Sequence, residues 1–201
     1  SVAGRLGLIP VIGGGIVLIA FLTENAAESW SALHIEKTLG GSPEQGAMGP
    51  AALALTMGLA RLAGQGLVTR LDPFRVLTGG ALIAGCGALA AALAQTWNFA
   101  YAGFIVMGLG ASVIAPTAFS LVGRLATPEA RARAVARATL YGYFGYFVGP
   151  PTLGFIAGAL AWLVGAAVVA FIALWLAGWV LMRAEKRRLL DERMAYRGNN
   201  G

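Results

Sequence analysis

Long apolar segments separated by short polar connections set the pattern of this chain. Continuous apolar runs, without the alternation of a membrane β-strand, are typical of helices. Each run is close to the roughly 20 residues that a helix needs to cross the hydrocarbon core of a bilayer. The pattern predicts an all-α, polytopic membrane protein. Its six predicted transmembrane helices cover about residues 6–33, 47–68, 74–94, 98–122, 135–159 and 160–182, and a basic tail covers residues 183–201.

Composition agrees with lipid as the surroundings of most of the chain. Hydrophobic residues make up 58% of the 201 residues and charged residues only 12%, and the mean hydropathy is +0.72. A soluble domain carries about 25% charged residues, because its surface has to be solvated. This chain has too little charge for a water-facing surface. Its one cysteine, Cys86, excludes an intrachain disulfide.

The positions of the basic residues predict how the chain is oriented. Cytoplasmic loops of membrane proteins carry an excess of Lys and Arg. With six spans, almost all of the basic residues fall on one side, and the opposite connections hold only Lys37. We therefore expect a protein of the bacterial inner membrane with both termini on the cytoplasmic side. The pI of about 10.1 then reflects a basic face toward anionic lipid rather than nucleic-acid binding. The residues on the basic side are Arg5, Arg70, Arg75, Arg124, Arg131, Arg133, Arg137, Arg183, Lys186, Arg187, Arg188, Arg193 and Arg197.

Three stretches carry a family resemblance. Residues 66–75, GLVTRLDPFR, resemble the G-x-L-A-D-R-x-G-R-R loop between two helices of the major facilitator superfamily. Arg70 and Arg75 match its basic positions, whereas Thr69 stands at the acidic position and Asp72 at a glycine. The preceding residues, from Arg61 on, look like the G-R-L-x-G-D segment of the same family.

The other two stretches resemble one branch of that family. Residues 24–33, ENAAESWSAL, are similar to the E-G-x-x-x-D-W-S-A stretch in the seventh helix of bacterial fucose-permease-like transporters. Residues 142–151, GYFGYFVGPP, look like the G-Y-x-G-x-x-x-G-P-P pattern of their eleventh helix. The resemblance implies that the chain is the C-terminal six-helix half of such a transporter. It also implies a partner: either the N-terminal six-helix half or a second copy of this chain.

Two glutamates in the first apolar segment are the leading candidates for chemistry. Glu24 and Glu28 are four residues apart, so both lie on one face of a helix, and Ser31 continues that face. Acidic residues inside a span usually face a cavity or a polar partner, because ionised carboxylates are costly in hydrocarbon. A carboxyl that can be charged or neutral is what a proton-coupled carrier requires. The alternative is that the helix ends before Glu24, which leaves both acids in periplasmic water.

Other polar and aromatic residues join this candidate site. Asn25 and Trp30 flank the acids, and Tyr141 and Tyr143 of the fifth segment are aromatic candidates for contact with a solute. Arg61 lies about 13 Å from the cytoplasmic end of the second span along an ideal helix. It either pairs with another helix or snorkels to the interface, or it contacts an anionic substrate. In the fourth segment Pro116 predicts a local bend.

These residues favour secondary active transport of a small solute, a sugar or another polar metabolite, driven by a proton gradient. The alternative is a non-transporting six-helix membrane module that binds a partner, or a self-pairing half. No nucleotide motif, nucleophile–base pair or cofactor fingerprint appears, so neither an enzyme nor a cofactor is expected. A metal site is not expected either, since His34 is the single histidine.

Overall fold

The computed structural model describes residues 9–68, 70–156, 178, 179, 181, 183 and 188, and these residues are organised as helices. Four helical segments are long and apolar enough to cross a membrane: Pro10–Thr38, Pro43–Gly64, Pro73–Ala92 and Trp97–Leu125. The predicted sixth span, 160–182, and the tail lie almost entirely outside the described residues. The elements are α1 (Ile9–Leu33), the π-helical turn η2 (His34–Thr38), α2 (Pro43–Val68), α3 (Pro73–Ala92), α4 (Trp97–Ala111), α5 (Ile114–Leu125) and α6 (Arg131–Ile156).

The first helix continues through its polar residues. α1 includes Glu24 and Glu28 and ends only at Leu33. Thr23 fits into the helix because its hydroxyl donates a hydrogen bond to the carbonyl of Ile19, at 2.8 Å. The alternative in which the helix ends before the acids is therefore wrong.

α2 begins at Pro43, four residues before the predicted start of the second span. Ser42 and Gln45 form a reciprocal cap: the amide of Gln45 donates to the Ser42 hydroxyl, and the amide of Ser42 donates to the Gln45 side chain. Proline suits the first helical position because its missing N–H would have no partner there. Gly40, with φ of 68°, makes the preceding turn in a conformation that glycine adopts without strain.

The fourth predicted span is a broken helix. α4 ends at Ala111 and α5 begins at Ile114. Proline at position 116 has no N–H to donate to the carbonyl four residues back, and its ring crowds that carbonyl. The interruption at Ser112 and Val113 lies at this position, where the sequence predicted a bend.

α6 is helical from Arg131 through Pro150 and Pro151 to Ile156. The two prolines do not end the helix, and the Thr152 hydroxyl donates to the carbonyls of Val148 and Gly149. α6 is not among the four candidate spans, because its three tyrosines, prolines and glycines lower its mean hydropathy.

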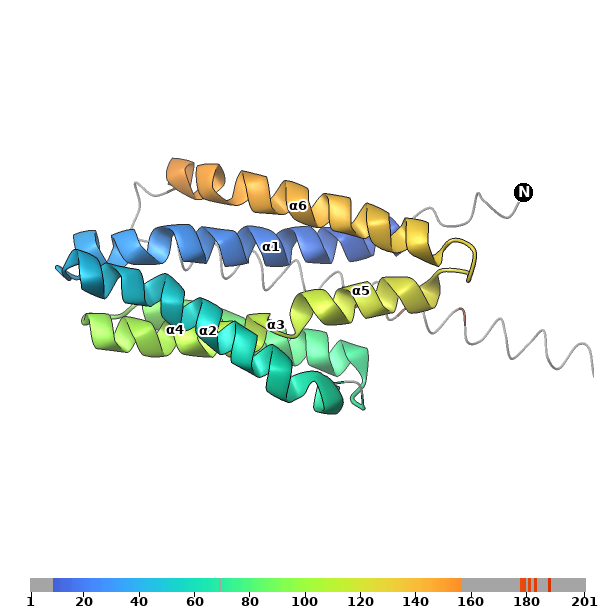
Figure 1. The fold of residues 1–201 in the computed structure, drawn as a ribbon, viewed down its shortest axis with the longest axis horizontal. Coiled ribbons are helices and arrows are strands. Elements are labelled where there is room, and N and C mark those ends of the chain that lie inside the picture. Colours follow the sequence, from blue (N-terminus) through green and yellow to red (C-terminus); the bar gives the residue numbers. More distant parts are fainter. Residues whose placement is uncertain are drawn as a thin grey trace, which may run out of the picture.

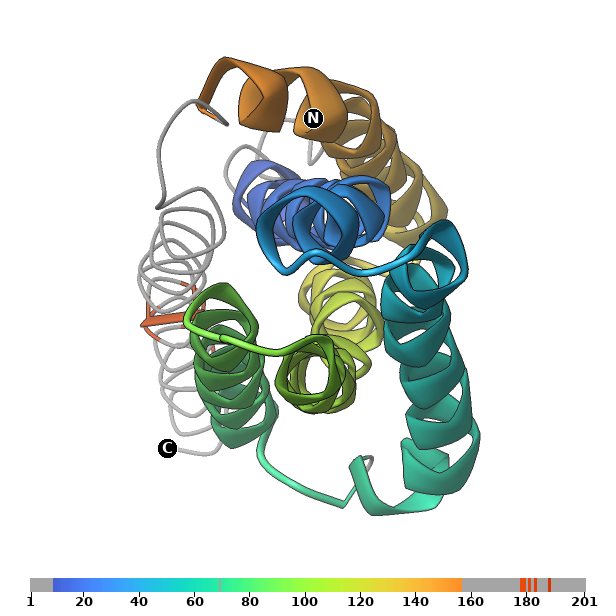
Figure 2. The same ribbon diagram turned by 90° about the vertical axis from the view of Figure 1, so that its left-hand side faces the viewer.

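The helices pack as a bundle in which α1 is central. α1 lies between α6 and α5 in both views, and α5 continues the line of α4 (Figures 1 and 2). α2 packs against both α1 and α4, and α3 packs against α4. The most extensive interfaces are α1 with α6 and α3 with α4. Glycines allow the two helices of each interface to approach each other closely. A Cβ on Gly145 of α6 would overlap the Leu18 carbonyl of α1, and one on Gly87 of α3 would overlap the backbone of Met107 in α4.

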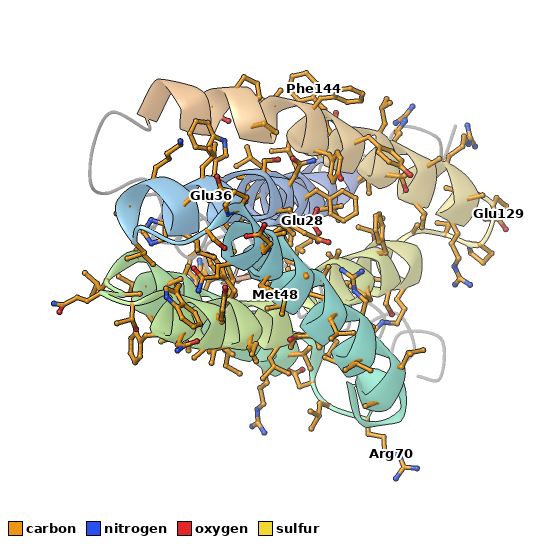
Figure 3. The ribbon with its side chains drawn as sticks, turned by 60° about the vertical axis from the view of Figure 1, so that its left-hand side comes forward. Glu28, Glu36, Met48, Arg70, Glu129 and Phe144 are labelled. Carbon is orange, nitrogen blue, oxygen red and sulfur yellow. The ribbon has the colours of Figure 1, made fainter. Side chains whose placement is uncertain are left out.

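The two ends of the bundle differ in charge. Arg70, in the connection from α2 to α3, and Glu129, in the connection from α5 to α6, lie toward one end, and Glu36 lies toward the other (Figure 3). The arginines that flank these two connections, such as Arg70 and Arg131, therefore lie toward the same end of the described part of the chain.

Candidate functional site

An ion pair joins the first two helices inside the bundle. The Arg61 guanidinium of α2 lies 3.6 Å from the Glu24 carboxylate of α1, and the two side chains are 39% and 18% exposed. An Arg within a span requires a partner or a route to water. Of the alternatives for Arg61, the structure shows pairing between helices.

Arg61 also binds the broken fourth span. Its Nε donates to the carbonyl of Ser112, at 3.4 Å. Ser112 is four residues before Pro116, so this is the carbonyl that the proline leaves without its helical donor. Unpaired carbonyls are costly in a low-dielectric interior. Arg61 thus donates to the free Ser112 carbonyl through Nε and pairs with the Glu24 carboxylate through a terminal nitrogen of the same guanidinium.

Glu28 is half-buried one turn along α1 from Glu24. The positive charge of Arg61 acts on both carboxylates, and the two carboxylates repel each other. One arginine therefore faces two acids at the junction of α1, α2 and the α4–α5 break. A second positive charge, or a proton on one of the two acids, would bring the net charge of these three side chains to zero.

A cavity of about 600 Å³ lies next to Arg61. α2 contributes Ala60, Arg61 and Gly64, the α2–α3 connection contributes Leu71, α3 contributes its first residue, Pro73, and the α4–α5 segment contributes the rest. Because Leu71 and Arg124 belong to the end of the bundle that holds Arg70, the cavity extends from the charged pair toward the basic end. The lining residues of the α4–α5 segment are Ser112, Val113, Pro116, Thr117, Ser120 and Arg124.

The α5 wall of this cavity is polar at helical spacing. Pro116, Ser120 and Arg124 are four residues apart and exposed, so they form one face of α5, while the opposite face is buried in the core. Thr117 lies beside them and is 7% exposed. Its hydroxyl is the one buried side-chain polar atom without a hydrogen-bond partner among the described residues.

Asn25, Ser31 and Trp30 lie in helix contacts. Asn25 is buried and accepts a hydrogen bond from the Ser29 hydroxyl, at 3.1 Å. Ser31 is fully buried, and its side chain lies against Gly49 of α2. Trp30 is half-buried against the core cluster that includes Ala26 and Ala27. The structure thus brings Glu24 and Glu28 to Arg61 and leaves these three neighbours in the packing of α1.

The two tyrosines lie on α6 against α1. The Tyr141 ring covers Gly14, and Tyr143 makes an edge-to-face contact with Phe21, with ring centroids 6.4 Å apart. Both tyrosines are exposed on their outer sides. Neither lines the cavity beside Arg61.

The loop-motif residues lie at the basic end, apart from Arg61. Asp72 caps α3, where its carboxylate accepts a hydrogen bond from the Arg75 amide, at 3.1 Å. Arg70 and Arg75 are exposed. Thr69, at the acidic position of the motif, lies outside the described residues.

Sequence reasoning did not assign the partners of the charged pair. Pro116 was predicted only to bend its segment, and Arg124 was counted only among the residues on the basic side. A signal was present: the carbonyl four residues before an internal proline needs a donor, and a buried Arg in another span needs an acceptor. His34, noted in the sequence only as the single histidine, is buried, with Nε2 3.1 Å from the Ala91 carbonyl of α3.

These apolar helices, with a charged pair between them, define a multi-pass membrane protein. Residues 13–195 match the Major Facilitator Superfamily, and the chain belongs to this family of transporters.

Curated relatives and a solved structure agree with this assignment. The chain is 37% identical over 144 residues to an uncharacterized MFS-type transporter of Yersinia pestis, an alignment that covers 72% of this chain and 37% of the relative. It is 31% identical over 163 residues to an uncharacterized transporter of Sinorhizobium fredii, covering 78% and 43%. The chain therefore spans about two fifths of the length of these relatives.

The fold is similar to that of a peptide transporter, POT, crystallised with alafosfalin. The TM-score is 0.73 at 16% sequence identity, over 88% of this chain and 38% of the transporter. At this identity the similarity establishes the shared fold.

Proposed function

We propose that this chain is the C-terminal six-helix half of a secondary active transporter of the fucose-permease-like branch. It moves a small polar solute, a sugar or another metabolite, across a bacterial inner membrane by alternating access, with both termini in the cytoplasm. Its partner is the N-terminal six-helix half or a second copy of the chain. Alignments that cover 37% and 43% of two relatives are of the length that one half would give.

The ion pair between Glu24 and Arg61, within the two helices, is the observation that carries this proposal. It joins α1 and α2 at the carbonyl of a broken helix, in a chain whose described helices are otherwise almost free of charge inside the bundle. Charged side chains within membrane helices mark ion and substrate pathways more often than structural contacts. A carboxylate that gains a proton releases its arginine, so proton uptake changes the contact between helices.

Proton coupling then depends on Glu24 and Glu28. Arg61 is one cation for two acids, and protonation of either glutamate restores the balance of charge. The proton gradient supplies the energy, and the solute occupies the space between this half and its partner. The large exposed side chains of α2 and α6, such as Leu62 and Phe147, provide apolar surface that lipid and the partner half share.

The test measures proton-driven currents on a solid-supported membrane. The protein expressed from its complete reading frame is reconstituted and given a panel of monosaccharides and small organic acids. A Glu24→Gln/Glu28→Gln double variant should lose the proton-coupled current, because neither amide can carry a proton. Glu36→Gln, at the opposite end of the bundle, is the matched control and should retain it. An unchanged current in the double variant would contradict the coupling role.

A further inference from the structure

We propose that the cavity beside Arg61 binds a small hydroxylated organic anion, which replaces Glu24 as the partner of the guanidinium. This inference rests on the transport function proposed above and names the class of solute. It starts from the lining of the cavity: Arg61 lies at its inner end and Arg124 at its outer end, and no Asp or Glu is among the lining residues that the structure describes. A cavity of this charge favours anions over neutral or cationic solutes.

The geometry of the ion pair permits exchange of partners. The nitrogen–oxygen distance of 3.6 Å is longer than the 2.7–2.9 Å typical of a charge-assisted hydrogen bond between a cation and a carboxylate. The Arg61 side chain is also 39% exposed and lines the cavity. A carboxylate or phosphate group in the cavity can therefore approach the guanidinium more closely than Glu24 does.

The α5 wall supplies groups for the rest of the solute. Thr117 is one of the residues that line the cavity, and its buried hydroxyl has no partner among the described residues. Ser120 is exposed on the same wall. Hydroxyls both donate and accept, so they match the hydroxyl groups of a sugar-like molecule. The volume of about 600 Å³ is within the range of pockets that hold small organic ligands.

Exchange of partners links the anion to the proton. When the anion pairs with Arg61, the Glu24 carboxylate loses its cation while it remains between apolar helices. It then binds one proton and becomes a neutral acid, and the net charge of the group returns to its value before the anion bound. Release of the anion reverses both steps. Binding of the anion thus promotes proton uptake at Glu24.

The experiment measures binding without transport, by the shift of the thermal unfolding midpoint of the detergent-purified protein from its complete reading frame. The probes are two matched pairs, glucuronate against glucose and succinate against succinamide. We expect the anions to raise the midpoint and the neutral counterparts to leave it unchanged. Arg61→Gln should weaken anion binding by about tenfold or more, since it removes a charged partner. Arg124→Gln should weaken it less, and Arg133→Gln, an exposed arginine of α6 at the same end, should not change it.

The decisive variant is Glu24→Gln, which removes the competitor of the anion. It should tighten anion binding severalfold, whereas a purely structural ion pair predicts weaker binding. Thr117→Val should weaken it severalfold, and Thr139→Val on α6, outside the cavity, should not. Should Arg61→Gln fail to fold, Arg61→Lys, which keeps the charge, tests the same contact.

Two outcomes would overturn the inference: stabilisation by glucose and succinamide equal to that by the anions, or a Glu24→Gln variant that binds the anions no more tightly than the original chain. Neither outcome affects the proposed transport of a polar solute, which depends on the proton-coupled currents of the Glu24→Gln/Glu28→Gln variant. The two proposals therefore fail separately.

Discussion

Arg61 shows how one side chain serves two acceptors on different helices. The guanidinium is planar and has five N–H donors, so its Nε and a terminal nitrogen reach the Ser112 carbonyl and the Glu24 carboxylate together. A lysine presents one ammonium at the end of a flexible stem. The choice of arginine at this position follows from the separation of the two acceptors.

Gly145 sets the approach of α6 to α1. Replacing it by alanine places a methyl group against the Leu18 carbonyl, which is backbone and cannot move aside. We expect Gly145→Ala to destabilise the protein by about 1–3 kcal/mol, the usual cost of overpacking a close contact. The free energy of unfolding in mixed micelles measures this effect.

Gly58 of α2 is the matched control for this substitution. A Cβ built on Gly58 meets no atom within 4 Å, and alanine favours a helix over glycine. Gly58→Ala should therefore leave the free energy of unfolding unchanged or raise it slightly. Equal losses at both positions would mean that the contact between α1 and α6 is not the cause.

At the scale of the element, the break between α4 and α5 is held by a group from another helix. Because Pro116 has no N–H, the Ser112 carbonyl depends on Arg61 for a hydrogen bond. The break is thereby tied to α2 through this bond and to α1 through Glu24. A change in the Glu24 partner is transmitted to the position where the fourth span bends.

A double-mutant cycle between Arg61 and Pro116 tests this connection. Arg61→Lys removes the Nε donor and should cost about 1–3 kcal/mol, the penalty for a buried unpaired group. Pro116→Ala restores an N–H that can donate to the Ser112 carbonyl, so in this background Arg61→Lys should cost about 1 kcal/mol less. The free energies of unfolding of the four proteins give the coupling.

Pro50 provides the control cycle. It also lies inside a helix, α2, but the carbonyl four residues before it belongs to Gly46, which does not bond to Arg61 among the described contacts. The effects of Arg61→Lys and Pro50→Ala should be additive. Additive effects for Pro116→Ala as well would show that Arg61 does not support the break.

At the scale of the whole molecule, the basic connections share one end of the bundle. Arg70 and Glu129 lie toward this end, and Glu36 lies toward the other (Figure 3). In a membrane the basic end is expected in the cytoplasm. The cavity that contains Arg124 then opens toward the cytoplasm, and the cap of α2 faces the outside.

Cysteine labelling of intact and permeabilised cells checks this arrangement. The native Cys86 is exposed and is first replaced by serine. Single cysteines are then introduced as Arg70→Cys, Glu129→Cys and Lys37→Cys. A membrane-impermeant maleimide should label only position 37 in intact cells and all three after permeabilisation. Labelling of positions 70 and 129 from opposite sides would overturn both the topology and the transport proposal.

Much of the helical architecture could be predicted from the sequence. The first, second, third and fifth apolar runs coincide with α1, α2, α3 and α6 within a few residues, and the fourth run covers α4 and α5 together, with the bend that Pro116 predicts. The errors are local. The polar residues Thr23 and Glu24 suggested an interruption, but their side chains fit within α1, because a threonine hydroxyl can bond to the preceding turn. Capping by Ser42 and Asp72 moved two helix starts toward the N-terminus.

The sequence alone determined that the chain is a polytopic helical membrane protein, that the connections beside Arg70 and Arg131 fall on one side, and that Glu24 and Glu28 share a helix face. These properties follow from local rules of hydropathy, charge and helical period, which act over a few residues. Only the tertiary structure decided that Arg61 meets Glu24 and the Ser112 carbonyl, 51 positions away from Arg61 in the chain. The packing of three helices selects these partners, since any acid or free carbonyl at a similar depth would satisfy the same local pattern.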